Sequence, residues 1–164
     1  MKQKKFLLCV IAALLTFAVT SCNGDELPDI GKTLVGTSWK LVGFFDVEKN
    51  ILTEPEVKDC EDCYTIKFTN AVGFRDGKKY WECWGHGIEI GFGCSYITDY
   101  ASSTIDIYPI VFAIPIIEIS DEENRYIGVF GVYDHHRPFE LQDNRLKLYY
   151  NNKKNYLLFQ PRRQ

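Results

Sequence analysis

The amino-acid sequence predicts a mainly β protein: a compact antiparallel barrel-like or sandwich-like domain with one short helix, preceded by a cleaved signal peptide. Three observations predict this fold class. Apolar residues alternate with a period of two over most of the chain, one segment shows the helical period, and the N-terminus has the pattern of an export leader. With 164 residues, 46% of them hydrophobic, the chain has room for one domain and is too apolar to be disordered. We divide it into a signal peptide (1–21), a cysteine with a flexible tether (22–33) and a β domain (34–164).

The leader begins with positive charge and continues as an apolar run. Lys2, Lys4 and Lys5 are followed by the apolar segment Phe6–Val19. A helix of about 14 residues would be about 21 Å long, whereas the hydrocarbon core of a bilayer is about 30 Å thick. The run is therefore too short for a membrane span and fits a signal peptide.

The end of the leader carries the motif Val19-Thr20-Ser21-Cys22, which resembles the lipobox of bacterial lipoproteins. This resemblance implies that Cys22 becomes the first residue of the mature chain and carries acyl chains that hold it in a membrane. The acidic segment Asn23–Glu26 resembles the surface-export signal of Bacteroidetes lipoproteins, which implies an outer-membrane anchor with the cell surface as one option. The alternative for the lipobox-like motif is a secreted protein that is cleaved elsewhere. The alternative for the acidic segment is a solvated linker that is not an export signal.

Alternation of apolar and polar residues predicts the strands of the domain. In the first strand, Trp39, Leu41 and Gly43 alternate with the residues between them, and in another Tyr64, Ile66 and Phe68 share one face. The predicted strands are Ser38–Phe44, Tyr64–Phe68, Ile88–Ile90, Thr104–Ile107, Leu146–Tyr150 and Tyr156–Phe159. The polar link Asn151–Asn155 makes the last two a hairpin. The apolar run Ile110–Ile119 contains Pro115, which predicts a bend or a sheet edge because proline cannot donate to a ladder.

One segment has the helical period instead. In Asp121–Tyr133, apolar residues stand at Tyr126, Val129, Phe130 and Tyr133, which is the spacing of one helix face. The acidic residues at its start suit the positive end of a helix dipole. We predict one short amphipathic helix, with a strand as the alternative because two glycines interrupt the segment.

The order of several short motifs resembles the META-domain family. The motifs are Trp39-Lys40-Leu41 at the start, Gly93-Cys94-Ser95 leading to Tyr100, a short Glu-rich helix, Leu146-Lys147-Leu148 and a final apolar strand. Small Bacteroidetes lipoproteins with a segment like 59–64 and an ending like 148–151 are a closer likeness. The resemblance implies a compact antiparallel barrel-like fold with one helix in a protein of the cell envelope, and it implies no catalytic residues. A lipocalin-like barrel is the neighbouring possibility.

Four cysteines remain in the predicted mature domain once Cys9 leaves with the leader and Cys22 takes the lipid. They are Cys60, Cys63, Cys83 and Cys94, and an even number in an exported chain predicts two disulfides, with three pairings open. The alternatives are free buried thiols, a redox-active Cys60–Cys63 pair, which its acidic neighbours disfavour, and a zinc site that uses His86.

Two aromatic residues form the other candidate site. Trp81 and Trp84 lie in a glycine-containing stretch and could stack on a sugar or an aromatic ligand. The alternative is that both are core residues, and their odd spacing turns one of them outward on a regular strand. His135 and His136 are interpreted as part of a polar loop, and we predict no metal site and no cofactor.

Charge and motif content limit the function. Three of the 19 basic residues and none of the 22 acidic residues lie in the predicted leader, so the mature chain would carry a net charge of −6, which disfavours nucleic acid as a partner. No phosphate loop, dinucleotide fingerprint or catalytic signature is present, so we do not expect an enzyme. We expect a lipid-anchored binding or interaction module for an envelope protein or for a small apolar or glycan ligand. The alternative is a structural or stress-protective lipoprotein.

Overall fold

The computed structural model describes residues 33–75, 77–109, 118–131 and 134–162. The predicted signal peptide, Cys22 and the tether up to residue 32 lie outside the described residues. The predicted bend at Pro115 and the last residue of the predicted helix stripe, Tyr133, also lie outside them.

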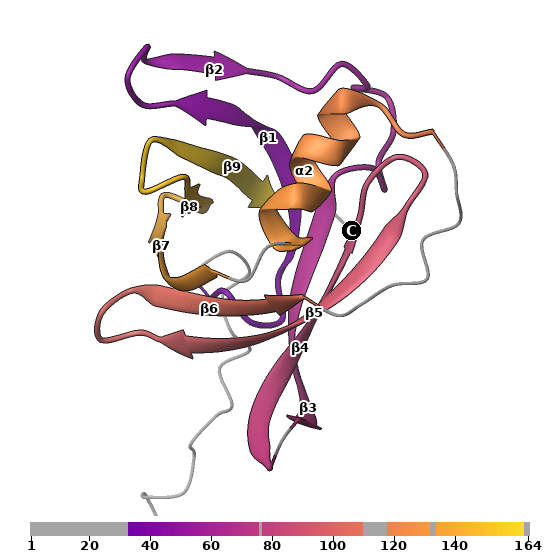
Figure 1. Ribbon diagram of the computed structural model, residues 1–164. Helices are drawn as coiled ribbons and strands as arrows, with labels where there is room; N and C mark the ends of the chain where they lie inside the picture. The colour runs from indigo at the N-terminus through magenta and orange to yellow at the C-terminus, as the bar shows by residue number, and fades with distance from the viewer. Residues whose placement is uncertain (1–32, 76, 110–117, 132–133, 163–164) are drawn as a thin grey trace, which may run out of the picture.

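All described strands belong to one antiparallel sheet that closes into a ring (Figure 1). Its order is β2-β1-β3-β4-β5-β6-β7-β8-β9, and a further pairing of β1 with β9 closes the ring, leaving β2 as an extension beside β1. The strands are β1 (Ser38–Asp46), β2 (Ile51–Thr53), β3 (Thr65–Arg75), β4 (Lys78–His86), β5 (Gly91–Asp99), β6 (Thr104–Pro109), β7 (Asp134–Gln142), β8 (Arg145–Tyr150) and β9 (Asn155–Pro161). In the residues that the structure describes, the predicted mainly β, barrel-like class with one helix is confirmed.

Five of the six predicted strands lie in the observed sheet, with two local differences. The 146–159 hairpin is confirmed as β8 and β9. In β1 a register shift between Leu41 and Gly43 turns Phe44 into the core together with Trp39 and Leu41, so the strict alternation predicted there does not hold. Tyr64 is buried as predicted, but it has φ 53° and lies just before β3.

Two predictions are wrong. Ile88–Ile90 is not a strand but the connection between β4 and β5, because its three backbone N–H groups bond to the carboxylate of Glu123 rather than to a neighbouring strand. His135 and His136 lie in β7 rather than in a loop. They occupy a register shift in the β6–β7 pairing, where His136 takes the loop-like φ of 51°.

The interior of the ring is filled by side chains. Trp39, Tyr96 and Phe159 are among the largest residues with less than 2% exposure, and the indole Nε1 of Trp39 donates to the Leu34 carbonyl at 3.2 Å. Aromatic rings meet edge to face, as between Phe68 and Tyr96 at 5.2 Å between centroids. A packed centre leaves the outer surface and the rims as the places where the described part of the domain could bind a partner.

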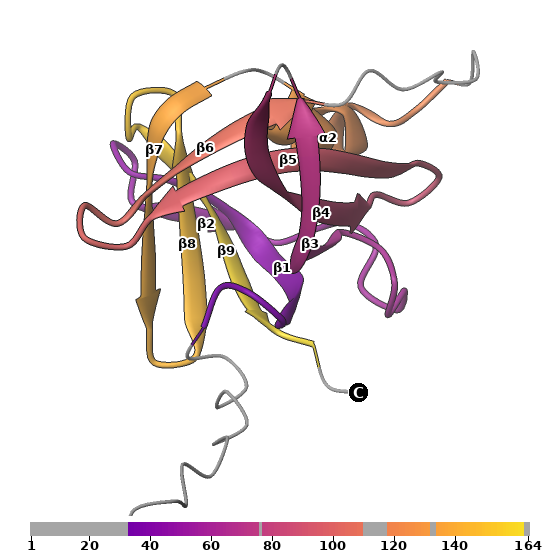
Figure 2. The ribbon, with the colours of Figure 1, turned by 90° about the horizontal axis from the view of Figure 1, so that it is seen from below.

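The helix α2 (Asp121–Gly131) confirms the predicted helix and covers one end of the ring (Figures 1 and 2). Tyr126, Val129 and Phe130 form its buried face, as the period predicted. Its N-terminus is capped by Ser120, whose Oγ accepts the Glu123 N–H at 3.1 Å. Near its C-terminus the buried Arg137 of β7 donates to the Val129 carbonyl at 2.6 Å, which places a cation at the negative end of the helix dipole.

Candidate functional site

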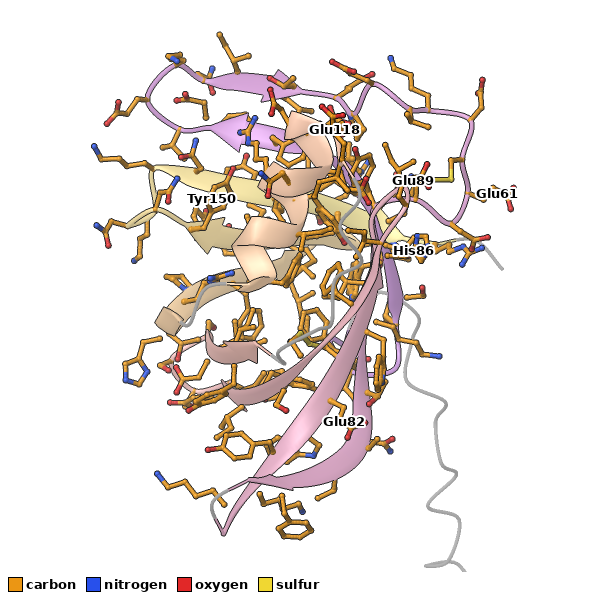
Figure 3. The ribbon with its side chains drawn as sticks, turned by 45° about the vertical axis from the view of Figure 1, so that its right-hand side comes forward. Glu61, Glu82, His86, Glu89, Glu118 and Tyr150 are labelled. Carbon is orange, nitrogen blue, oxygen red and sulfur yellow. A yellow bond between two sulfur atoms is a disulfide. The ribbon has the colours of Figure 1, made fainter. Side chains whose placement is uncertain are left out.

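A groove with a volume of about 610 Å³ lies on the outer surface, where the ends of β1, β8 and β9 meet two connections. We call it the rim groove and define it by its charged lining residues, which are Lys40, Lys58, Glu61, Asp143, Arg145 and Arg162. Lys58 and Glu61 come from the connection between β2 and β3, which passes the outer edge of the domain (Figure 3). A second hollow of about 230 Å³ shares Lys40, Lys58 and Gln160 with it, so the rim groove continues along the outer face of β1.

The wall of the rim groove is fixed by a disulfide and a lysine. Cys60 and Cys63 are bonded, with their Cα atoms 5.4 Å apart, and the Cys63 N–H donates to Cys60 Sγ at 3.1 Å. The ammonium group of Lys40 donates to the carbonyl oxygens of Cys60, at 2.6 Å, and of Cys63. Lys40 thereby ties the connection to β1.

The ammonium group of Lys40 is partly withdrawn from water, and its pKa is lowered. Burial is the largest cause and the nearby charge of Arg162 adds to it, whereas Asp62 and Glu61 act in the opposite direction. A partly desolvated cation interacts more strongly with an incoming anion than a fully hydrated one.

The rim groove is basic although the chain as a whole is acidic. Four of its lining residues are cations and two are anions. Arg162 is paired with Asp62 at 2.6 Å and Lys58 with Glu54 at 2.7 Å. Within the described part of the chain, Lys40 and Arg145 make hydrogen bonds but no ion pair; Arg145 Nη1 donates to Gln160 Oε1 at 3.2 Å. Such groups are suited to bind carboxylates or phosphates.

The predicted disulfides are confirmed, and the structure selects one of the three possible pairings. Besides Cys60–Cys63, it joins Cys83 of β4 to Cys94 of β5, which face each other in register with Cα atoms 5.1 Å apart. All four sulfur atoms are therefore engaged in disulfides.

His86, the other residue of the zinc alternative, is exposed, and its Nδ1 lies 3.0 Å from the Gly87 carbonyl oxygen. Among the described residues, no group of three or more His, Cys, Asp or Glu could hold a metal ion.

The two candidate stacking residues are not brought together. Trp84 is 52% exposed, while Trp81 is half-buried against the core, 6.2 Å from the ring of Tyr96. Their odd spacing on β4 places them on opposite faces of the strand, as that spacing implied. A shared platform of the two indole rings does not form.

The residues of the rim groove were missed by the sequence analysis. Lys40, Lys58 and Arg145 are single cations in three separate segments, and no spacing rule links them. The pairing of β1 with β9 and of β9 with β8 brings Lys40 and Arg145 to one rim. The hydrogen bonds of Lys40 to the carbonyl groups of Cys60 and Cys63 hold the connection that carries Lys58 beside them. From the sequence, the acidic neighbours of Cys60 and Cys63 indicated only that this pair is not redox-active, and they did not indicate the wall of a basic groove.

Two known proteins are similar to this chain, one in sequence and one in fold. No protein-family model matches this chain. Over 160 residues it is 27% identical to a Tannerella forsythia protein named "putative lipoprotein", and the match covers 97% of this chain and 96% of that protein. The fold is similar to the crystal structure of a DUF4847 family protein from Bacteroides vulgatus, with a TM-score of 0.52 and 15% identity, over 80% of this chain and 96% of that one. Neither comparison supports the META-domain likeness, which remains a resemblance of short motifs.

In the ranges that the structure covers, no helix has both the length and the apolar character needed to cross a bilayer.

Proposed function

We propose that this chain is a lipoprotein of the cell envelope, anchored in the outer membrane through an acylated Cys22, and that its β domain is a non-enzymatic binding module. The leader with its lipobox-like motif supports the anchor, as does the name of the similar Tannerella forsythia protein, which matches along nearly the whole chain. The two disulfides suit an oxidising compartment outside the cytosol.

The rim groove is the proposed binding site, and its ligand carries a carboxylate or a phosphate. The observation that carries this proposal is the excess of cations in the groove, where Lys40 and Arg145 have no carboxylate partner within the described residues. A small apolar ligand is less well supported, because the interior of the ring is filled and most of the side chains that line the groove are charged groups or amides. Acidic glycans and lipid headgroups share the required chemistry.

The binding proposal is tested by titrating the full mature protein with inorganic phosphate, with polygalacturonate and with phosphatidylglycerol vesicles, using calorimetry. We expect one of the two larger probes to bind more tightly than phosphate, and Arg145→Gln to weaken that binding roughly tenfold. The control is Lys67→Gln, which removes an exposed cation of β3 outside the groove and should leave binding unchanged. Equal effects of the two substitutions, or no binding of any probe, would favour a structural or stress-protective lipoprotein instead.

The anchor is tested separately. Cys22→Ala should abolish labelling of the protein with palmitate and release it from the membrane fraction. Labelling that survives this substitution would contradict the anchor without affecting the groove.

A further inference from the structure

The hairpin of β3 and β4 continues beyond the rest of the sheet as a two-stranded ribbon (Figure 1). β5 pairs with β4 only from Trp81 to His86, and β1 pairs with β3 only from Thr65 to Lys67. Between these limits, Val72–Arg75 of β3 pair only with β4, and Lys78–Tyr80 of β4 pair only with β3. We call this part the hairpin tip.

One face of the hairpin tip is apolar and open to solvent. Val72 faces Trp81, and Phe74 faces Lys79, so these four side chains share one face. Phe74 is 77% exposed and Val72 42% exposed, while Trp81 is half-buried and joins this face to the core. An isolated exposed phenylalanine is common, but a contiguous apolar face at the end of a projecting ribbon marks an interaction surface.

Cations border this apolar face. Lys79 shares this face with Phe74, and its ammonium group lies 5.6 Å from the centre of the Trp81 ring. The exposed Lys78 pairs with Arg75 at the end of the ribbon, on the opposite face. Glu82 belongs to the opposite face, where its carboxylate approaches Gly73. Apolar and aromatic side chains next to lysines are the combination that inserts into the headgroup region of a bilayer with anionic lipids.

An irregularity in β3 sets the direction of the hairpin tip. The register between β3 and β4 shifts between Phe68 and Val72, where four steps on β3 correspond to two on β4. The hydroxyl of Thr69 donates to the Glu82 carbonyl at 2.8 Å, and the Thr69 carbonyl accepts the Tyr96 hydroxyl at 2.7 Å. Such a bulge bends and twists a ribbon, and these bonds hold the bend in place.

The length of the chain before the domain brings this surface within reach of a membrane. Cys22 and Thr33 are eleven positions apart, so the connection spans at most about 40 Å when fully extended. A domain held at that distance by an acylated Cys22 meets the bilayer continually, which favours even a weak second contact.

A second apolar hairpin has no excess of cations. β1 and β2 expose Ile51 (52%) and Leu52 (38%), but at their turn Lys49 is paired with Asp46 at 3.4 Å and Lys154 with Glu48 at 3.4 Å. An anionic surface would not attract that hairpin, which makes it a matched comparison.

We propose that the hairpin tip docks onto the surface of an anionic lipid bilayer, with Phe74 and Val72 among the headgroups and acyl-chain ends and with Lys78 and Lys79 at the lipid phosphates. This inference rests on the proposed anchor. The contact adds a second attachment point and so fixes the orientation of the domain above the membrane.

The test measures quenching of tryptophan fluorescence by brominated acyl chains. The full acylated protein, carrying Trp84→Phe, is reconstituted into vesicles of phosphatidylcholine and brominated phosphatidylglycerol in equal parts. The emission then comes from Trp81 and from Trp39, and Trp39 is fully buried. We expect the brominated lipid to quench the Trp81 emission. In Phe74→Ser most of this quenching should be lost, whereas the matched variant Ile51→Ser should be quenched as strongly as the parent. Replacing the anionic lipid with brominated phosphatidylcholine should also reduce the quenching.

The outcomes separate docking from anchoring. Absent quenching in the parent protein, or equal quenching in Phe74→Ser and the parent, overturns the docking proposal. Unchanged thermal midpoints establish that both serine variants are folded. Failure of the anchor would appear instead as an unacylated Cys22 in the mass of the N-terminal peptide, whereas failure of docking appears in a chain whose acylation is intact.

Discussion

The carboxylate of Glu123 fills the space that a side chain on Gly87 would need, because a Cβ atom at that position would overlap its Oε1. The same oxygen accepts the N–H groups of Ile88, Glu89 and Ile90 at 2.8, 2.8 and 3.0 Å. With Glu123 only 1% exposed, one buried carboxylate shapes the β4–β5 connection and fastens the start of α2 to it.

Replacing Glu123 with alanine should lower the free energy of unfolding by about 3–5 kcal/mol, because three N–H groups would lose their acceptor. Glu123→Gln should cost about 1–3 kcal/mol, since an amide oxygen accepts weaker hydrogen bonds than a carboxylate. Glu118→Gln, at an exposed position before the helix, should stay within about 0.5 kcal/mol of the parent. Urea unfolding followed by tryptophan fluorescence measures all three, and equal midpoints for Glu123→Ala and Glu118→Gln would contradict this role.

Two glycine-to-alanine substitutions should have opposite signs. Gly87→Ala should destabilise the protein by about 1–3 kcal/mol, because the new methyl group displaces the Glu123 carboxylate from its three donors. Gly128 lies in α2, and nothing lies within 4 Å of the position that a Cβ atom would take there, so Gly128→Ala should stabilise the helix by about 0.5–1 kcal/mol. Thermal midpoints of the two variants give the comparison, and a shift in the same direction for both would refute the steric argument.

The fold class could be predicted because it depends on patterns among residues that are close in the sequence. The period of two in β8 and β9 and the polar link between them specified a hairpin directly, and the stripe containing Tyr126 and Phe130 specified the helix. Ile88–Ile90 was wrongly predicted as a strand because its apolar residues alternate as in a strand. Its backbone N–H groups instead donate to Glu123, which is more than thirty residues away. A tertiary hydrogen bond of this kind leaves no local pattern.

The candidate site could be predicted only where neighbouring residues define it. The sequence singled out Cys60 and Cys63, which form part of the wall of the rim groove. Arg145 and Lys40, however, reach the groove through strand pairings between the two ends of the chain. Arg137 shows the same limit: in the sequence it stands beside two histidines in a polar segment, yet it is 3% exposed and bonds to the end of α2. Sequence reasoning finds contacts within a hairpin or helix more readily than contacts between distant strands.

The two disulfides should contribute unequally to stability. Cys83 and Cys94 are 11 positions apart and Cys60 and Cys63 only three, so the chain-entropy model gives about 3 kcal/mol for the first and about 2 kcal/mol for the second. The double substitution of Cys83 and Cys94 by alanine should therefore lower the urea midpoint more than the same change at Cys60 and Cys63. Alkylation of the unreduced, unfolded protein followed by intact-mass measurement checks that all four cysteines are bonded, and uptake of label at any of them would contradict this.

Stability should decrease above pH 10 because of buried tyrosines. Burial raises the pKa of the Tyr126 hydroxyl well above its ordinary value of 10.0, and the neighbouring Tyr64 adds to the shift. In the unfolded chain this hydroxyl ionises near pH 10, whereas in the folded protein it stays neutral and donates to the Thr65 carbonyl at 2.9 Å. Above pH 10 the unfolded state binds fewer protons, so its free energy falls relative to the folded state. The stabilisation is complete below pH 10 and is lost as the pH rises, by up to about 1.4 kcal/mol per pH unit for Tyr126.

Tyr126→Phe separates this titration from the loss of a hydrogen bond. At pH 8 the variant should be less stable than the parent by about 1 kcal/mol or more, because the Thr65 carbonyl loses its donor. Between pH 10 and 11, however, its stability should decline less steeply, since ionisation of this residue no longer stabilises the unfolded state.

The control variant is Tyr149→Phe. Desolvation, and then the hydrogen bond to Glu140, raise the pKa of Tyr149 to about 12, but its partial exposure to solvent should make the change in slope smaller. Urea midpoints at pH 8, 10 and 11 measure the slopes, and parallel declines in the parent and Tyr126→Phe would rule out Tyr126 as a source of the alkaline instability.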